Sequence, residues 1–185
     1  ELHQSNAEKL GSVKELNRAT ANLGIVRLHQ QKYDLAIIML EQSRYLYDQM
    51  SARESQVVIY TNLSQAYTMI ENHPKALSLA EKSLEIANSI EGAYPPCLIA
   101  FRCLAGCELL EVEQRIDYLQ SALALTQDHR VFDKAACLLG LSWLHSSADK
   151  RISFAEEGTQ LLHDIGAQRW LMKIRYGYPH LPLII

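Results

Sequence analysis

Two stretches of this chain carry matching residues forty positions apart. Residues 22–43 read NLGIVRLHQQKYDLAIIMLEQS, and residues 62–83 read NLSQAYTMIENHPKALSLAEKS. Asparagine, leucine, alanine, glutamate and serine recur at the same places in both stretches. Self-similarity at this period predicts a repeat architecture, because a unit of this size cannot bury its apolar face alone and must stack on a similar neighbour.

A leucine followed by a small residue marks each unit. The markers are Leu23-Gly24, Leu63-Ser64, Leu104-Ala105 and Leu139-Gly140, with successive offsets of 40, 41 and 35 residues. Each marker lies in an apolar segment of helical period and is followed by a turn and a second helical segment. We predict helix pairs at residues 12–30/33–50, 54–71/74–90, 96–110/113–126 and 129–146/149–165. A capping helix at 167–176 would complete one repeat domain over 1–176, followed by an apolar tail at 177–185.

Small residues and turn residues support these helical hairpins. Pro74 follows Asn72-His73 and suits the first turn of a helix, where its missing N–H is no loss. Gly166 stands where a left-handed helix end is expected. We expect the small residue of each marker to lie where the two helices of a hairpin press together. Its counterparts on the second helices are alanines: Ala36, Ala76, Ala80, Ala122 and Ala155.

Composition and motifs exclude several functions. The chain has 185 residues and a net charge of −3 with no basic run, so it lacks the charge pattern of a nucleic-acid or membrane-surface protein. No phosphate-binding loop, dinucleotide fingerprint or nucleophile elbow occurs, so we expect no enzyme and no cofactor. Cys103 and Cys107 share a helix face, but no further cysteine or histidine occurs at the spacing that a metal site needs. We therefore expect these cysteines to be buried apolar residues and expect no metal site. Four cysteines without a disulfide framework favour the cytoplasm, and a start at Glu1 with an end at HLPLII favours an excerpt of a longer polypeptide.

The second unit, YTNLSQAYTMIENHPKALSLAEKSLEIA, resembles the tetratricopeptide repeat. Its signature positions hold Tyr60, Leu63, Ser64, Tyr67, Ala76 and Ala80. The first unit departs from the family at Arg27, where an aromatic residue is usual, and Glu108 replaces the tyrosine in the third. Units three and four also have shorter internal turns. The resemblance implies an all-α fold: a right-handed α-solenoid of about four hairpins with a C-terminal capping helix.

The forty-residue period and the ending AEEGTQLLHDIGAQRWLMKI are similar to the sensor arrays of bacterial ATPase-linked transcription regulators of the maltose-regulator type. In those proteins the helical array follows a nucleotide-binding domain and binds an inducer or a regulatory protein. This similarity implies the sensor or interaction segment of a larger bacterial regulator. The alternative is a free-standing adaptor that grips an extended peptide. Self-association through the tail HLPLII is a further expectation.

The tetratricopeptide register implies that the first helix of each hairpin lines a concave groove. The groove residues predicted in this way are Arg18, Asn22, Ile25, His29, Thr61, Asn62, Gln65, Met69, Arg102 and Lys134. Asn22 and Asn62 are the main candidates for binding a peptide backbone, since an amide offers both a donor and an acceptor. The alternative is that they are polar helix residues facing water. A clamp for a C-terminal carboxylate is not expected, because Ala21, Ile99 and Cys103 replace the basic residues it needs.

Overall fold

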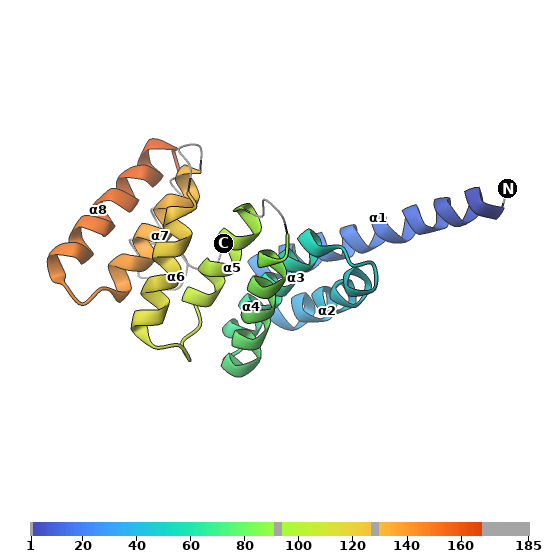
Figure 1. The fold of residues 1–185 in the computed structure, drawn as a ribbon, viewed down its shortest axis with the longest axis horizontal. Coiled ribbons are helices and arrows are strands. Elements are labelled where there is room, and N and C mark those ends of the chain that lie inside the picture. The colour runs from blue at the N-terminus through green and yellow to red at the C-terminus, as the bar shows by residue number, and fades with distance from the viewer. Residues whose placement is uncertain (1, 91–93, 127–129, 168–185) are drawn as a thin grey trace. The chain divides into compact units, whose positions relative to one another are not determined.

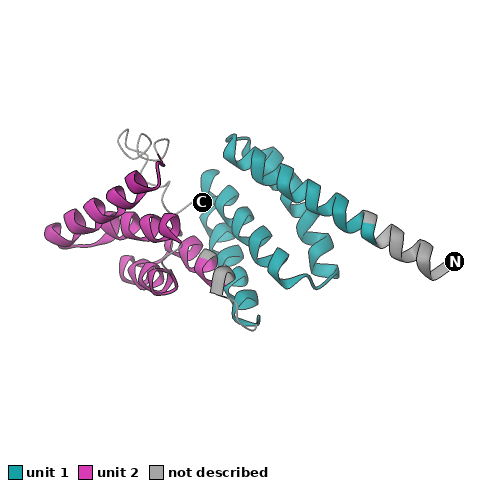
Figure 2. Cartoon of the chain, turned by 90° about the horizontal axis from the view of Figure 1, so that it is seen from above, with its two compact units in different colours: residues 1–90 teal, residues 91–185 magenta. Residues whose placement is uncertain are grey.

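The computed structural model describes residues 2–90, 94–126 and 130–167, and in these ranges the protein is all-α (Figure 1). Its helices are α1 (Leu2–His29), α2 (Tyr33–Gln49), α3 (Arg53–Met69), α4 (His73–Asn88), α5 (Tyr94–Ala105), α6 (Val112–Ala124), α7 (Val131–Leu144) and α8 (Ala148–Asp164). The chain forms two compact units, Glu1–Ile90 with α1–α4 and Glu91–Ile185 with α5–α8 (Figure 2). In both units each helix packs on its neighbour in sequence, so two helical hairpins stack within each unit.

The four predicted helix pairs are confirmed, with two differences at their ends. Helix α1 begins at Leu2, ten residues before the predicted start. Helix α5 ends at Ala105 instead of residue 110, so the internal turn of the third hairpin is longer than expected. The amides of Gly106 and Cys107 donate to the carbonyls of Cys103 and Leu104, the tight i to i−3 bonds that end a helix.

Two parts of the predicted organisation are not tested by the described residues. The capping helix at 167–176 lies outside them except for Ala167, and the tail at 177–185 lies wholly outside them. The single repeat domain over 1–176 stays a prediction. The boundary between the two units falls after Ile90, between the second and third hairpins.

The core of the first unit comes from one face of each helix. Ala21 and Leu28 of α1, together with residues of the other three helices, form one buried apolar cluster. The other members are Ala36, Leu40, Tyr47, Ile59, Tyr60, Leu63, Ala66 and Leu79. On α3 the members Ile59, Leu63 and Ala66 are three or four residues apart, which aligns them along one apolar stripe of the helix.

Small residues allow close helix contact in three of the four hairpins. A Cβ placed on Gly24 would lie 2.9 Å from Leu40 Cγ, so α1 and α2 meet there as predicted. Ser64 Oγ donates to the carbonyl of Ala76 at 2.7 Å, which joins α3 to α4 at the equivalent point. In the fourth hairpin the expected Ala155 is only half-buried. Gly158 lies at the contact instead, where a Cβ would be 2.9 Å from Leu139 Cγ and 3.1 Å from the carbonyl oxygen of Ala135.

The repeated serines make the same hydrogen bond in both hairpins of the first unit. Ser43 Oγ donates to the carbonyl of Asn17 at 3.4 Å, and Ser83 Oγ donates to the carbonyl of Val57 at 3.2 Å. Both bonds join residues 26 positions apart, and both pairs are related by the forty-residue repeat. Serine therefore recurs because each second helix is fixed to a backbone carbonyl of the first.

Four of the described helices are followed, two residues after their last helical residue, by a residue with positive φ. Gly166 has φ of +68°, which confirms the predicted left-handed end of α8. Gln31 and Glu71, which are equivalent in the repeat, both have φ of 61°, and Ser51 has φ of 49°. At Glu71 the next amide, that of Asn72, donates back to the carbonyl of Tyr67 at 2.9 Å, which is the Schellman hydrogen bond. Non-glycine residues in this conformation cost stability, since Cβ crowds the backbone.

Candidate functional site

The predicted groove of the first unit is partly accessible. Arg18, Asn22 and His29 of α1 are exposed, while Ile25 is half-buried and packs against the apolar cluster. Arg18 forms an exposed ion pair with Glu15, with 2.6 Å between Nη2 and Oε2. On α3, Met69 is exposed. The first helices of the unit therefore present a mixed polar and apolar surface.

The two asparagines on which the prediction depends differ in their hydrogen bonding. Asn62 is half-buried, and its Nδ2 donates to the carbonyl of Val58 one turn earlier at 2.7 Å. A partner would compete with this bond for one of the two amide hydrogens, and the amide oxygen would remain for binding. Asn22 is exposed on α1. Its amide is therefore the more accessible of the two.

Three predicted groove residues lie in the interior, and this corrects the expectation. Thr61 is buried, its hydroxyl donates to the carbonyl of Val57 at 2.8 Å, and it lies 2.9 Å from Ser83 Oγ. The contact with Ser83 joins α3 to α4 within the hairpin. Gln65 is also buried. Their positions on α3 follow from helix geometry, since residues four apart lie on the same face.

Arg102 is the third interior residue, and its guanidinium joins two helices of the second unit. It is 2% exposed, and its Nη1 lies 2.6 Å from Asp133 Oδ1 on α7. Arg130 pairs with the other carboxylate oxygen of Asp133 at 3.0 Å. Lys134 remains half-buried at the surface, where its Nζ lies 2.9 Å from Glu157 Oε1 of α8. Arg102 thus joins α5 to α7, and Lys134 joins α7 to α8.

A polar cluster joins α2 to α3. Arg44 lies between Glu41 and Asp48, with distances of 2.7 and 2.9 Å to their carboxylate oxygens. Across the helix interface, the hydroxyl of Tyr60 donates to Asp48 Oδ2 at 3.1 Å, and the hydroxyl of Tyr67 donates to Glu41 Oε1 at 3.4 Å. Burial, with the neighbouring carboxylates, raises the pKa of both tyrosines. Burial lowers the pKa of Arg44, but its contacts with Glu41 and Tyr60 raise it overall. This cluster is a structural joint between the two hairpins.

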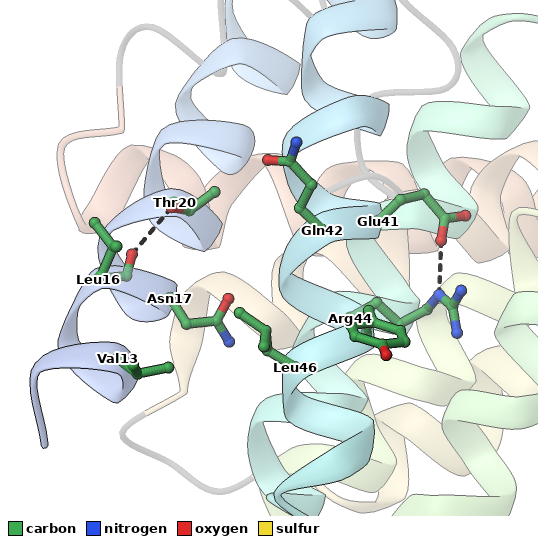
Figure 3. A pocket seen from close by; sticks show the side chains of 9 residues that line it. Val13, Leu16, Asn17, Thr20, Glu41, Gln42, Arg44 and Leu46 are labelled. Carbon is green, nitrogen blue, oxygen red and sulfur yellow. Dashed lines mark hydrogen bonds and ion pairs between the residues drawn. The ribbon is translucent and has the colours of Figure 1, made fainter. Parts of the chain in front are cut away.

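A pocket of about 660 Å³ lies between α1 and α2 (Figure 3). Val13 and Asn17 of α1 point toward Leu46 of α2, and Thr20 lies one turn further along, its hydroxyl donating to the carbonyl of Leu16 at 3.0 Å. The lining residues are Val13, Leu16, Asn17, Thr20, Glu41, Gln42, Arg44, Tyr45 and Leu46. This pocket was not predicted from the sequence. The signal that could have found it is the apolar pair Val13 and Leu16 on a face of α1 that the repeat register does not bury.

The described residues contain no group of three or more cysteine, histidine or acidic side chains arranged to hold a metal. Cys103, Cys107 and Cys137 are buried, and burial raises the pKa of the Cys137 thiol to about 11. In the same part of the chain no helix has the length and apolar character needed to span a bilayer.

The stacked hairpins define a class of helical-repeat protein, and a comparison with known families shows what the first unit is similar to. Residues 15–89 match the family model of the tetratricopeptide repeat. The match covers both hairpins of the first unit, from the middle of α1 to the end of α4, so the first unit is similar to tetratricopeptide repeats. No curated protein matches the chain. Tetratricopeptide repeats generally mediate binding to proteins or peptides, and they are generally not enzymes.

Proposed function

We propose that this chain is a non-enzymatic binding module that grips an extended segment of a partner protein along α1 and α3. The observation that carries the proposal is the accessible surface of the first helices in two tetratricopeptide-like hairpins, where Asn22, Asn62 and Met69 are offered to a ligand. The amides would bind the peptide backbone, and Met69 would contact an apolar side chain. Arg18, the arginine predicted to line this surface on α1, is paired with Glu15, so a neutral or amphipathic segment fits better than an acidic one.

The proposed context is the sensor or interaction segment of a larger bacterial transcription regulator in the cytoplasm. Its support is the forty-residue period and the ending AEEGTQLLHDIGAQRWLMKI. In this context the bound species would be a regulatory protein or a small-molecule inducer. The alternative is a free-standing adaptor, supported by the asparagines alone. Finding a nucleotide-binding domain in the same polypeptide would favour the regulator, and finding none would favour the adaptor.

A selection from a random peptide library, followed by affinity measurement with the selected peptide, tests the groove. In the double variant Asn22→Ala/Asn62→Ala, we expect affinity to fall about tenfold, since two hydrogen bonds to the backbone together contribute on the order of 1.4 kcal/mol. The matched control is Gln42→Ala, an exposed amide on α2 away from the proposed groove. Equal affinity of the double variant and the control would contradict the proposal, and so would selected peptides that bind only the second unit.

A further inference from the structure

One face of α1 carries exposed aliphatic side chains that the groove does not use. Val13, Leu16, Leu23 and Val26 are all exposed, and Leu16 is 69% exposed. At 3.6 residues per turn these four lie along one stripe of the helix, next to the stripe that packs on α2. We call these four residues the α1 end face.

The internal repeat shows what such a face does when it is covered. Leu63 of α3 is equivalent to Leu23, and Ala66 is equivalent to Val26. Leu63 and Ala66 are both 0% exposed and belong to the core of the first unit, whereas Leu23 is 49% exposed. Helix α2 packs directly on α3 and runs antiparallel to it, because the two are joined by a short turn at residues 50–52. The α1 end face therefore repeats a helix-docking surface.

The polar contact between α2 and α3 indicates which charge a helix docked on the α1 end face should carry. On α2, Glu41 accepts a hydrogen bond from Tyr67 of α3 at 3.4 Å. The residue of α1 equivalent to Tyr67 is Arg27, which is half-buried and donates to Gln30 Oε1 at 2.8 Å. A carboxylate placed like Glu41 on an incoming helix would meet a guanidinium instead of a phenol. An ion pair with Arg27 would then complement the aliphatic contacts.

The pocket between α1 and α2 adjoins this face. Val13 and Leu16 belong to both, and Thr20 of the pocket wall is equivalent to Tyr60, which is buried on α3. Because threonine is much smaller than tyrosine, the docking surface of α1 is hollowed at this point. An incoming helix would need a large apolar side chain here to pack as closely as α2 packs on α3.

We propose that the α1 end face binds an amphipathic helix of a partner protein, antiparallel to α1, with aliphatic residues on Leu16, Leu23 and Val26 and a carboxylate on Arg27. The helix binds as α2 binds α3. Asn22 of the groove lies one turn from Val26 at the border of this face, whereas Leu23 points about 100° away from Asn22 around the helix. The chain thus contacts partners in two ways, through an extended segment in the groove and through a helix at its end face.

A peptide with the sequence of α2, YDLAIIMLEQSRYLYDQ, is a direct probe because it already fits the equivalent face of α3. Labelled and capped at both ends, it is titrated with the full chain and followed by fluorescence anisotropy. We expect saturable binding that weakens at least tenfold for Leu23→Asp. The control Ile38→Asp, on the exposed outer side of α2, should bind like the unchanged protein. Leu16→Asp serves as a second end-face variant should Leu23→Asp unfold, as judged by circular dichroism.

Charge exchange tests the proposed register. We expect Arg27→Glu to weaken binding and the peptide variant Glu41→Lys to restore it. The groove variant Asn22→Ala/Asn62→Ala should leave peptide binding unchanged, so that failure of one proposal is distinguishable from failure of the other. Absence of saturable binding, or equal binding by Leu23→Asp and Ile38→Asp, would overturn the inference. Sedimentation of a dimer that Leu23→Asp converts to a monomer would also overturn it, because the occupant would then be a second copy of this chain.

Discussion

Replacing Gly24 by alanine tests whether α1 and α2 meet at the point the repeat predicts. The new methyl group would lie 2.9 Å from Leu40 Cγ, 3.0 Å from Leu40 Cδ2 and 3.2 Å from Met39 Cβ. All three distances are shorter than ordinary carbon–carbon contacts, and Leu40 is fully buried, so it has little room to move. The helices must separate, or the leucine must leave its preferred rotamer, at a cost of about 1–3 kcal/mol.

Alanine also has a higher helix propensity than glycine by about 1 kcal/mol, which opposes this cost. Gly11 provides the matched control, because it lies on the same helix and a Cβ there meets no atom within 4 Å. We therefore expect Gly11→Ala to raise the free energy of unfolding and Gly24→Ala to lower it. The difference between the two variants isolates the packing cost, on the order of 2 kcal/mol.

Urea unfolding followed by circular dichroism measures both variants. Gly158→Ala extends the test to the second unit, where the new Cβ would meet the backbone carbonyl of Ala135 at 3.1 Å as well as the side chain of Leu139. Since a backbone atom cannot rotate away, we expect Gly158→Ala to lose more stability than Gly24→Ala. Equal stabilisation by Gly11→Ala and Gly24→Ala would refute the close contact of α1 and α2.

Three further predictions concern helix ends and buried groups. Glu71→Gly should stabilise the protein by about 1 kcal/mol in thermal unfolding, because φ of 61° crowds a Cβ, and Gly166→Ala should change stability in the opposite direction. The pKa of Tyr60 is raised in the folded state by burial and by Asp48, so its contribution to stability is complete below about pH 10 and lost as the pH rises through the folded value. The free energy of unfolding of Tyr60→Phe should therefore fall less than that of the unchanged protein between about pH 9 and about pH 11. An equal fall in the two proteins would contradict this account. Cys137 should react with a disulfide reagent only when the protein unfolds, because burial raises its pKa to about 11, and rapid labelling of the native protein at neutral pH would show that the thiol is accessible.

The hairpins could be predicted from the sequence because their cause is local. A leucine next to a small residue recurs wherever two helices of a pair must touch, and this pattern located all four pairs. The early end of α5 was missed. It depends on the tight amide bonds of Gly106 and Cys107, while the apolar pattern continues to Leu110.

The interior groove residues could not be separated from the accessible ones in the same way. Arg102 looked accessible, and its burial depends on Asp133, which lies 31 residues away on another helix. Leu23 and Leu63 give the clearest case, since the same residue at the same place in the repeat is half exposed in one hairpin and buried in the other. Only the presence of α2 on α3 separates them. Exposure is decided by which helix lies next to the face.

The serine bonds of the first unit have a consequence for folding order. Each connects a hydroxyl to a carbonyl only 26 residues earlier, so a hairpin can close on itself before any distant part of the chain takes part. Loops of this length cost little entropy to close, and proteins dominated by such local contacts reach their native state quickly. During synthesis, the hairpin of α1 and α2 could therefore form while α3 and α4 are still being translated. The folded first hairpin would then provide the surface on which the second hairpin packs.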